Sequence, residues 1–280
     1  MTLPNPFLQE ITAWISAFPL QGQRVPTASP HPVWQLGNIP LLLHAVALPR
    51  HIKEELPLNF FYDLSEEMTA QGFQIIHLWE DAWQSNRALV ISRIESLLGK
   101  NKSVYARLTT VSRLSNAQLS DFFQENHGNY VTKSRYRYGL WHKETLVAAA
   151  SFTGAKLLRN EEKSWKSAEL LRFATHQNTT VVGGLSKLIS AFRAEVLPAD
   201  LMTYADRDWS VGKSYERLGF VHEGNTPPHV FWVHLPSMQR FSAKQLALQE
   251  PDFQENEDIL RAKNYVRISN AGSMKFRLTF

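Results

Sequence analysis

The sequence predicts a protein of mixed α and β structure, and three observations lead to this. Apolar residues recur at helical spacing from Phe7 to Phe18 and again from Leu185 to Val196. Between such segments lie continuous apolar runs, such as Leu41–Leu48, which are typical of buried strands. Breaks rich in Gly and Pro separate the two kinds of segment, and no internal repeat or low-complexity tract is present. We therefore expect an α/β (α+β) fold.

Residues 1–100 are expected to form a small α/β domain. Asn5-Pro6 is a favourable helix start, since the cap is followed by proline in the first turn. The elements expected after this helix are a strand over Leu41–Leu48, a helix over Leu64–Ala70, a strand over Phe73–Trp79 and a helix capped by Ser85 that reaches Leu98. The sequence GKNKS at 99–103 is the best linker candidate, so we expect a second domain over 101–280.

The second part begins with a helix and a hairpin and then alternates strands with helices. Its expected elements are a helix at Ser115–Asn126, a hairpin at Tyr138–Phe152, a strand at Ala168–Ala174, a helix over 185–196, a strand at Leu201–Ala205, a helix over 211–218, a strand from Phe220 and a strand at Phe231–Leu235. Gly219 is suited to end the helix over 211–218, because glycine adopts the left-handed conformation most easily. The segment YVRISNAGSMKFRLTF is expected to form a last hairpin turning at Asn270, Ala271 and Gly272.

Composition narrows the function classes. The chain has no cysteine, which excludes disulfides, thiolate metal sites and a cysteine nucleophile. The longest apolar run, from Ile39 to Pro49, is too short to span a bilayer. The N-terminal sequence MTLPNPFLQE does not resemble a signal peptide. We therefore expect a cytoplasmic protein without a membrane partner.

Charge is distributed unevenly along the chain. Residues 1–100 contain 6 Lys and Arg against 9 Asp and Glu, whereas residues 101–280 contain 24 against 17. A basic second half favours an anionic partner, such as a phosphorylated cofactor or a nucleic acid, although a solvated basic surface explains the same balance. An acidic first half is a poor surface for binding DNA phosphates.

Two segments of the second part resemble the GNAT acyltransferases. The first is VVGGLSKLI (181–189), which is similar to the glycine-rich turn with which that family binds the pyrophosphate of coenzyme A. The second is SYERLGF (214–220), which is similar to the family's last helix with its catalytic tyrosine. The resemblance implies a GNAT-like mixed sheet, acyl-CoA as cofactor with acetyl-CoA foremost, and no metal. The implied cofactor-binding residues are Val182, Gly183, Gly184, Leu185, Ser186 and Lys187.

The resemblance also implies catalytic roles. Tyr215 would protonate the departing thiolate, and Glu169 would be the general base that deprotonates the amine. Asp206 is a rival base. Packing of Tyr215, a surface position for Glu169 and a simple turn at the two glycines explain the same residues without chemistry.

Substrate contacts are expected from His127, Arg172 and Asp208. His127 and the basic, aromatic segment KSRYRYGLWHK (133–143) could form a substrate wall or contact nucleic acid, since bases stack on aromatic rings while Arg and Lys bind phosphates. A hairpin with one polar face explains this segment equally. Arg172 could instead pair with Glu169, and Asp208 could instead cap a helix.

A longer resemblance joins the two parts. Four segments are similar to phage-encoded homing-endonuclease-like proteins. They are QGFQIIHLWEDAW (71–83), RFATHQNTTVVGGLSKL (172–188), TYADRDWSVGKSYERLGF (203–220) and YVRISNAGSMKF (265–276). The resemblance implies that residues 1–100 have a restriction-endonuclease-like PD-(D/E)XK core, similar to very-short-patch repair endonucleases.

Such nucleases hold a divalent metal with clustered carboxylates. Glu10, Glu80 and Asp81 match acidic positions, but Ala45 and Ala47 stand where the strand should carry its acid. We therefore expect a degenerate nuclease-like domain without a metal. The histidines at positions 44, 51 and 77 show no metal-ligand spacing and are expected to be structural.

These observations lead to one preferred function and its alternatives. The preferred function is transfer of an acyl group from acyl-CoA, or from aminoacyl-tRNA, to a small-molecule or aminoacyl amine. The alternative is a nucleic-acid-binding protein related to phage homing endonucleases, with tRNA or DNA as partner, which binds without cleaving or cleaves through other carboxylates. A catalytically silent scaffold is the third reading. The sequence leaves the oligomeric state open.

Overall fold

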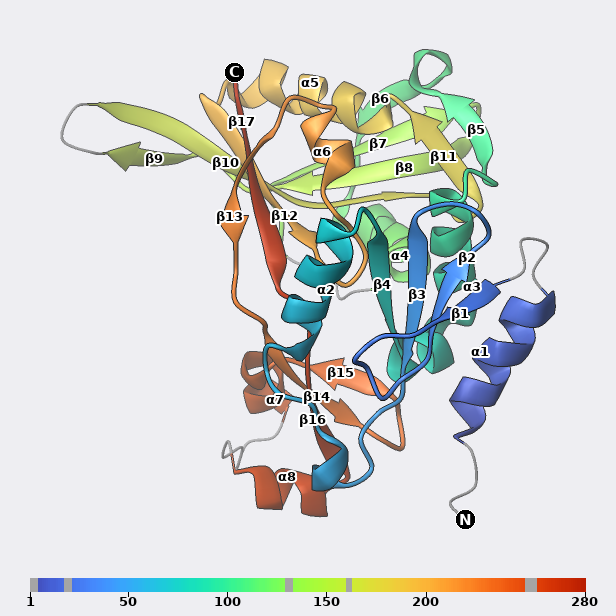
Figure 1. Cartoon of the computed structure of the whole chain (residues 1–280). Helices are drawn as coiled ribbons and strands as arrows, with labels where there is room; N and C mark the ends of the chain where they lie inside the picture. The colour runs from blue at the N-terminus through green and yellow to red at the C-terminus, as the bar shows by residue number, and fades with distance from the viewer. Residues whose placement is uncertain (1–4, 18–21, 129–132, 160–162, 250–255) are drawn as a thin grey trace. The chain divides into compact units, whose positions relative to one another are not determined.

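The computed structural model describes residues 5–17, 22–128, 133–159, 163–249 and 256–280. The chain forms two compact units, each assembled from segments distant in sequence. Unit 1 comprises residues 1–85, 205–212 and 225–274, and unit 2 comprises residues 86–204, 213–224 and 275–280. The expectation of mixed α and β structure is confirmed, because helices and sheets occur throughout the chain (Figure 1).

Unit 1 contains a four-stranded sheet formed by the first part of the chain. Its strands are β1 (Gly22–Val25), β2 (Val33–Leu36), β3 (Leu41–Val46) and β4 (Gln74–Trp79), in that order. The first three strands pair antiparallel, whereas β3 and β4 are parallel. The parallel pair needs a crossover, and α2 (Phe60–Ala70) provides it after a short 3₁₀ turn, η1 (Ile52–Glu54).

Helix α1 (Pro6–Ala17) precedes this sheet and begins where the sequence predicts. The Phe7 amide donates a hydrogen bond of 2.9 Å to the Asn5 side-chain oxygen, which caps the helix. The β1–β2 hairpin was not predicted, because three prolines between Val25 and Val33 obscure the alternation of apolar residues.

The segment 225–274 completes unit 1. It contains a three-stranded sheet of β14 (Val230–His234), β15 (Gln239–Phe241) and β16 (Tyr265–Ser269), with α7 (Ala243–Gln249) and α8 (Glu257–Ala262). Side chains of this sheet, among them Val233 and Ile268, pack in one core with Val46, Phe61 and Trp79 of the first part. Burial of this shared apolar surface joins the two segments of unit 1.

Helix α3 (Glu80–Leu97) is interrupted at Asn86, whose φ and ψ of −153° and 63° are not helical. The Asn86 side chain accepts a hydrogen bond of 3.2 Å from the Leu89 amide, so a new helical segment starts there. The sequence predicts this start at Ser85, one residue too early. The Ser85 hydroxyl instead donates to the Met238 carbonyl.

Unit 2 is built on a mixed sheet of eight strands, in the order β13-β17-β12-β10-β8-β7-β6, with β9 paired to β10. These strands are β6 (Thr110–Arg113), β7 (Tyr136–His142), β8 (Thr145–Phe152), β9 (Lys156–Arg159), β10 (Ser164–Thr175), β12 (Asp200–Asp206), β13 (Val221–Asn225) and β17 (Ser273–Thr279). Its helices are α4 (Asn116–Asn126), α5 (Gly184–Val196) and the short α6 (Lys213–Glu216). The hairpin predicted at 138–152 is confirmed as β7 and β8.

Two short parallel strands lie next to the start of α5. They are β5 (Lys102–Tyr105) and β11 (Thr179–Val182), and the 3₁₀ turn η2 (Ala106–Leu108) follows β5. The sequence predicts only a break at 178–184, because four residues are too few to show a strand period.

The hairpin predicted at the end of the sequence is wrong. Strand β16 pairs with β14, whereas β17 lies between β12 and β13 in the large sheet. The chain does turn at the expected place, where the Asn270 side chain accepts the Gly272 amide and Gly272 has a φ of 80°. That turn directs the two strands into different sheets, a choice set by long-range pairing.

Candidate functional site

The parallel pairing of β10 and β12 is limited to three residue pairs. Ser167, Ala168 and Glu169 pair with Asp200, Leu201 and Met202, although both strands continue beyond them. The register of β10 against β8 also shifts between Leu170 and Arg172, so Leu171 is an extra residue in the ladder. Such a bulge changes the direction of a strand. The two central strands thus stop pairing at Glu169 and Met202.

Thr203 bonds across the point where this pairing ends. Its hydroxyl donates a hydrogen bond of 3.0 Å to the Leu170 carbonyl, which has no ladder partner on β12 among the printed pairs. Thr203 is only 2% exposed, so a partner for its hydroxyl is needed. The sequence analysis did not single out Thr203, although it lies within the strand predicted at 201–205.

The Tyr215 hydroxyl is hydrogen-bonded to Thr203. Because Thr203 directs its own proton to Leu170, we infer that the phenol donates to Thr203. The Tyr215 ring is half-buried and lies 5.5 Å from both the Phe220 and the Phe276 ring centroids. Burial raises the pKa of Tyr215, so the phenol keeps its proton at neutral pH. Tyr215 therefore packs against two aromatic rings while its hydroxyl bonds to Thr203, beside the end of the β10–β12 pairing.

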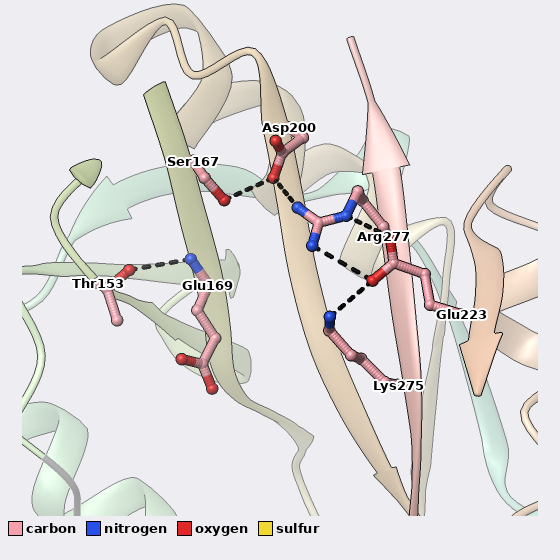
Figure 2. A network of polar contacts seen from close by, with 7 residues as sticks. All are labelled: Thr153, Ser167, Glu169, Asp200, Glu223, Lys275 and Arg277. Atoms are coloured by element: carbon pink, nitrogen blue, oxygen red, sulfur yellow. Dashed lines mark hydrogen bonds and ion pairs between the residues drawn. The ribbon is translucent and has the colours of Figure 1, made fainter. Parts of the chain in front are cut away.

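Glu169 stands at the last paired position of β10. It alternates with buried Ala168 and Leu170, so its half-buried carboxylate projects from the opposite face of the sheet. Its backbone is fixed, since its amide donates 2.9 Å to the Thr153 hydroxyl. Figure 2 shows the carboxylate apart from the dashed contacts around it. Burial raises the pKa of Glu169, and the charge of Lys156 opposes this effect.

A network of charged side chains lies beside Glu169 (Figure 2). Asp200 accepts 2.6 Å hydrogen bonds from Ser167 and from Arg277, and Lys275 lies 2.8 Å from Glu223. These residues occupy neighbouring strands, so their contacts tie β10, β12, β17 and β13 together. These partners explain the charged residues of the network as structural, and none of the printed contacts of the network involves the Glu169 carboxylate.

The two predicted glycines begin α5. Gly183 has a φ of 76° and precedes the helix, and Gly184 is buried. A Cβ at Gly184 would lie 2.9 Å from Val181 Cγ1, so this position has no room for a side chain. No side chain caps the helix at Gly183, and the first amides of the 13-residue helix have no partner within the helix itself. The glycine pair is explained by this turn, and the same turn presents amides at the positive helix end.

The other predicted cofactor residues surround this turn. Val182 and Ser186 are exposed, and Leu185 is half-buried. Lys187 donates from Nζ to the carbonyls of Ala106, at 2.8 Å, and Thr109. The ammonium therefore holds the η2 segment against the first turn of α5. Its predicted contact with phosphate stays a prediction and would require it to leave these carbonyls.

His127 and Arg172 are brought together in unit 2. His127 ends α4, where its amide donates 2.9 Å to the Phe123 carbonyl and Gly128 follows with a φ of 74°. Burial, followed by the charges of Arg172 and Arg93, lowers the pKa of His127 to about 3. The imidazole is thus neutral at physiological pH.

Asp206 and Asp208 belong to unit 1. The Asp206 carboxylate accepts the Asp208 amide, forming a turn. Asp208 is 2% exposed and accepts the Ala271 amide at 2.8 Å. Burial, reinforced by Asp206, raises the pKa of Asp208 to about 8. Asp208 does not cap α6, which starts later, at Lys213. Substrate contact by Asp208 and catalysis by Asp206 stay predictions.

The acidic residues of the nuclease-like pattern all have partners in unit 1. Glu10 accepts from the Trp83 indole at 3.0 Å, Glu80 accepts from the Leu48 amide at 2.9 Å, and Asp81 binds Arg240 through two hydrogen bonds. Within the described residues, no group of three or more His, Asp and Glu side chains is arranged to hold a metal ion.

Comparisons with known proteins give only distant likenesses. No family model matches the chain, and no curated protein does. Among solved structures, the chain is similar to GNAT-fold acetyltransferases over about 60% of its length. An acetyltransferase from Bacillus subtilis in complex with CoA is 12% identical, with 61% of this chain and 99% of that chain covered and a TM-score of 0.36.

Two further structures give similar values. A GNAT family acetyltransferase from Elizabethkingia anophelis with acetyl-CoA bound is 10% identical, with 62% and 99% covered and a TM-score of 0.33. The ribosomal-protein-S18-alanine N-acetyltransferase from Escherichia coli is 14% identical, with 61% and 93% covered and a TM-score of 0.34. None of the described helices is long and apolar enough to cross a membrane.

Proposed function

We propose that unit 2 is an N-acyltransferase that moves an acyl group from an acyl-CoA thioester to an amine. The observation that carries the proposal is the end of the β10–β12 pairing, where Thr203, the partner of the Tyr215 hydroxyl, lies on β12 and Glu169 stands at the last paired position of β10. Aminolysis of a thioester requires a group that accepts the proton of the amine and a group that protonates the leaving sulfur.

The residues present fit a CoA thioester at the start of α5. Free helix amides and the positive helix end favour a diphosphate, and the left-handed Gly183 lets the backbone approach it. Val182 to Lys187 would hold the ligand, which supplies the activated acyl group, with acetyl foremost.

In this scheme the protein's own groups handle the two protons. Glu169 accepts the proton of the attacking amine, because a carboxylate with a raised pKa is a better base at neutral pH. Tyr215 donates its proton to the leaving sulfur, and Thr203 holds the phenol in place until then. Asp206 remains the rival base.

Release of free thiol tests the proposal directly. The chain contains no cysteine, so every thiol detected during incubation with acetyl-CoA and an amine panel comes from CoA. We expect amine-dependent thiol release by the full chain that is lost in Tyr215→Phe. Tyr204→Phe is the matched control, since Tyr204 is 42% exposed on β12. No release with any amine, together with no binding of a thioester, contradicts the proposal.

Binding can be separated from turnover with two charge variants. Specific binding of acetyl-CoA should raise the melting temperature by mass action. Ser186→Asp puts a negative charge in the exposed first turn of α5, which favours the helix but repels a diphosphate. We expect this variant to lose the thermal shift, whereas Ser190→Asp, one turn further along α5, keeps it.

A second candidate is nucleic-acid binding, and one hairpin favours it. The β9–β10 hairpin extends beyond the rest of the sheet (Figure 1) and exposes Lys156, Arg159, Lys163 and Lys166. Trp165 lies beside them, with Lys163 Nζ 5.9 Å from its ring centroid. Basic and aromatic groups together suit single-stranded nucleic acid, such as the unpaired acceptor end of the aminoacyl-tRNA considered above. A thermal shift with tRNA or duplex DNA but with no thioester would favour this candidate.

A further inference from the structure

A cavity in unit 2 with polar and apolar walls takes no part in the proton transfers proposed above, although its wall includes His127, an expected substrate contact. Its volume is about 210 Å³, and its walls come from α3, the end of α4, the end of β10 and the loop at Asn101. At the ~30 Å³ that a water molecule occupies in the liquid, it is large enough for a small organic molecule.

Hydrogen bonds between side chains and backbone hold these walls in place. The Asn126 side chain accepts the Gln177 amide at 2.8 Å and donates to the Phe122 carbonyl, which fixes the end of α4. The Ser92 hydroxyl accepts the Asn178 amide at 2.8 Å, which ties α3 to the loop after β10. The cavity is therefore part of the folded scaffold of unit 2.

Two buried polar atoms on the cavity wall have no hydrogen-bond partner among the described residues. They are Nδ1 of His127 and Oδ1 of Asn101. An unpaired buried polar atom costs about 1–3 kcal/mol, so such atoms call for a partner. Asn101 already donates from its other side-chain atom to the Ser92 carbonyl, so its oxygen is oriented as an acceptor.

Two positively charged side chains lie at or near the cavity wall. Arg93 lines the cavity, and Arg172 lies near enough to depress the pKa of His127 together with Arg93. The Ser92 hydroxyl, which accepts from Asn178, keeps its own proton to donate. The arginine side chains and the Ser92 hydroxyl suit an anion, whereas Asn101 Oδ1 requires a hydrogen-bond donor on the ligand.

We propose that this cavity binds a small carboxylate that also carries a hydrogen-bond donor, of the hydroxy-acid or amino-acid class. The carboxylate meets Arg93 and the Ser92 hydroxyl, His127 Nδ1 binds one of its oxygens as an N–H donor, and the hydroxyl or amino group donates to Asn101 Oδ1. This site needs no CoA thioester, so it stands apart from the proposed transfer.

Calorimetric titration of the full chain tests the site with glycolate as the probe. We expect saturable binding of glycolate. Acetate, which lacks the donor, and ethylene glycol, which lacks the charge, should each bind at least about tenfold more weakly, because each loses a hydrogen bond or a charge contact. His127→Phe keeps the ring that packs 5.6 Å from Phe123 but removes Nδ1, and should weaken glycolate binding about tenfold.

Two surface variants keep the test decisive if His127→Phe disturbs folding. Arg93→Gln should weaken binding, whereas Arg87→Gln, on the same helix but outside the cavity wall, should not. No saturable binding of glycolate overturns the proposal. Equal binding of glycolate and sulfate, or binding unchanged in both Arg93→Gln and Asn101→Leu, overturns it as well, since the cavity then holds only water or an adventitious ion.

Discussion

Tyr215 shows how packing and chemistry can coincide in one side chain. Its ring is part of an aromatic group with Phe220 and Phe276, which explains its position without reference to function. Its hydroxyl, however, is bonded to Thr203, whose own proton goes to the Leu170 carbonyl. The sequence predicted the tyrosine from its helix face and the resemblance, but the threonine that orients it depends on how two strands separate.

Removing the phenol oxygen separates these two roles. We expect Tyr215→Phe to lower kcat for acyl transfer by about 10²-fold, a typical contribution of a general acid, while the melting temperature changes little. Steady-state kinetics and thermal unfolding measure the two effects. Thr203→Val is the informative partner variant, because it leaves the phenol but removes its orientation. A kcat for Tyr215→Phe equal to that of the wild type excludes the acid role.

Glu169 makes a prediction about pH. A general base must be ionised, and burial raises the pKa of this carboxyl, so kcat/KM should fall on acidification at a pH above the ordinary range of glutamate. Glu169→Gln should lower the rate and abolish this acid limb. If the limb persists in Glu169→Gln and disappears in Asp206→Asn, the rival base is the correct one.

At the scale of elements, the start of α5 combines a tight turn with the proposed diphosphate site. Gly184 is fixed by packing, since an added Cβ would lie 2.9 Å from Val181 Cγ1 and 3.3 Å from Leu140 Cδ1. We expect Gly184→Ala to lower the free energy of unfolding by about 1–3 kcal/mol through overpacking. Ser186→Ala, at an exposed position two residues later, is the control, and urea unfolding compares the two. Equal stabilities would mean that the turn relaxes easily.

Long periodic elements were predictable, and those that depend on distant partners were not. The α5 helix and the β7–β8 hairpin follow from local periodicity and were predicted within a few residues. The β5–β11 pair has only four residues in each strand, and its stability comes from pairing across the sequence. The turn at Asn270 was recognised, but its destination was not, because β16 and β17 find partners far along the chain.

The candidate site was predictable to a similar degree. Glu169, Tyr215 and the glycine pair could be identified from the residues and the resemblance. Thr203, Asn101 and the bond of Lys187 to the Ala106 carbonyl could not, because each depends on contacts between distant segments.

At the scale of the whole molecule, stability should depend on pH through buried histidines. In unit 1, His44 Nδ1 lies 2.8 Å from His77 Nδ1, and the outer nitrogens bond to Ser29 at 2.7 Å and Ser65 at 2.9 Å. Parallel pairing of His44 with His77 sets this chain of four side chains. Burial lowers the pKa of both histidines, to about 3 for His77. The sequence-based expectation that they are structural agrees with these contacts.

The direction of the pH effect follows from these pKa values. Above pH 6.5 both histidines are neutral in the folded and in the unfolded chain, so their full contribution to stability is present. Below pH 6.5 the unfolded chain binds protons that the folded chain refuses, so His77 contributes a loss of stability as pH drops from 6.5 toward 3, by up to ~1.4 kcal/mol per pH unit, and His44 acts in the same direction. Asp208 acts in the opposite direction between about pH 8 and 3.8, because its raised pKa lets the folded chain keep a proton that the unfolded chain has lost.

Urea unfolding at several pH values measures the slope of stability against pH for the wild type and for the double variant His44→Leu, His77→Leu. The variant should lose less stability on acidification than the wild type, because His127 and Asp208 contribute equally to both proteins. His51→Gln, at an exposed position, should leave the slope unchanged.

The position of β17 bears on how the protein is made. This strand lies between β12 and β13 in the sheet, yet the ribosome adds it only after the entire stretch 226–272. Until then the nascent polypeptide carries two strand edges with their central partner missing, and open edges invite pairing with other chains. Completion of the large sheet therefore waits until the segment 225–274 has been synthesised, and the open edges persist until β17 itself has emerged.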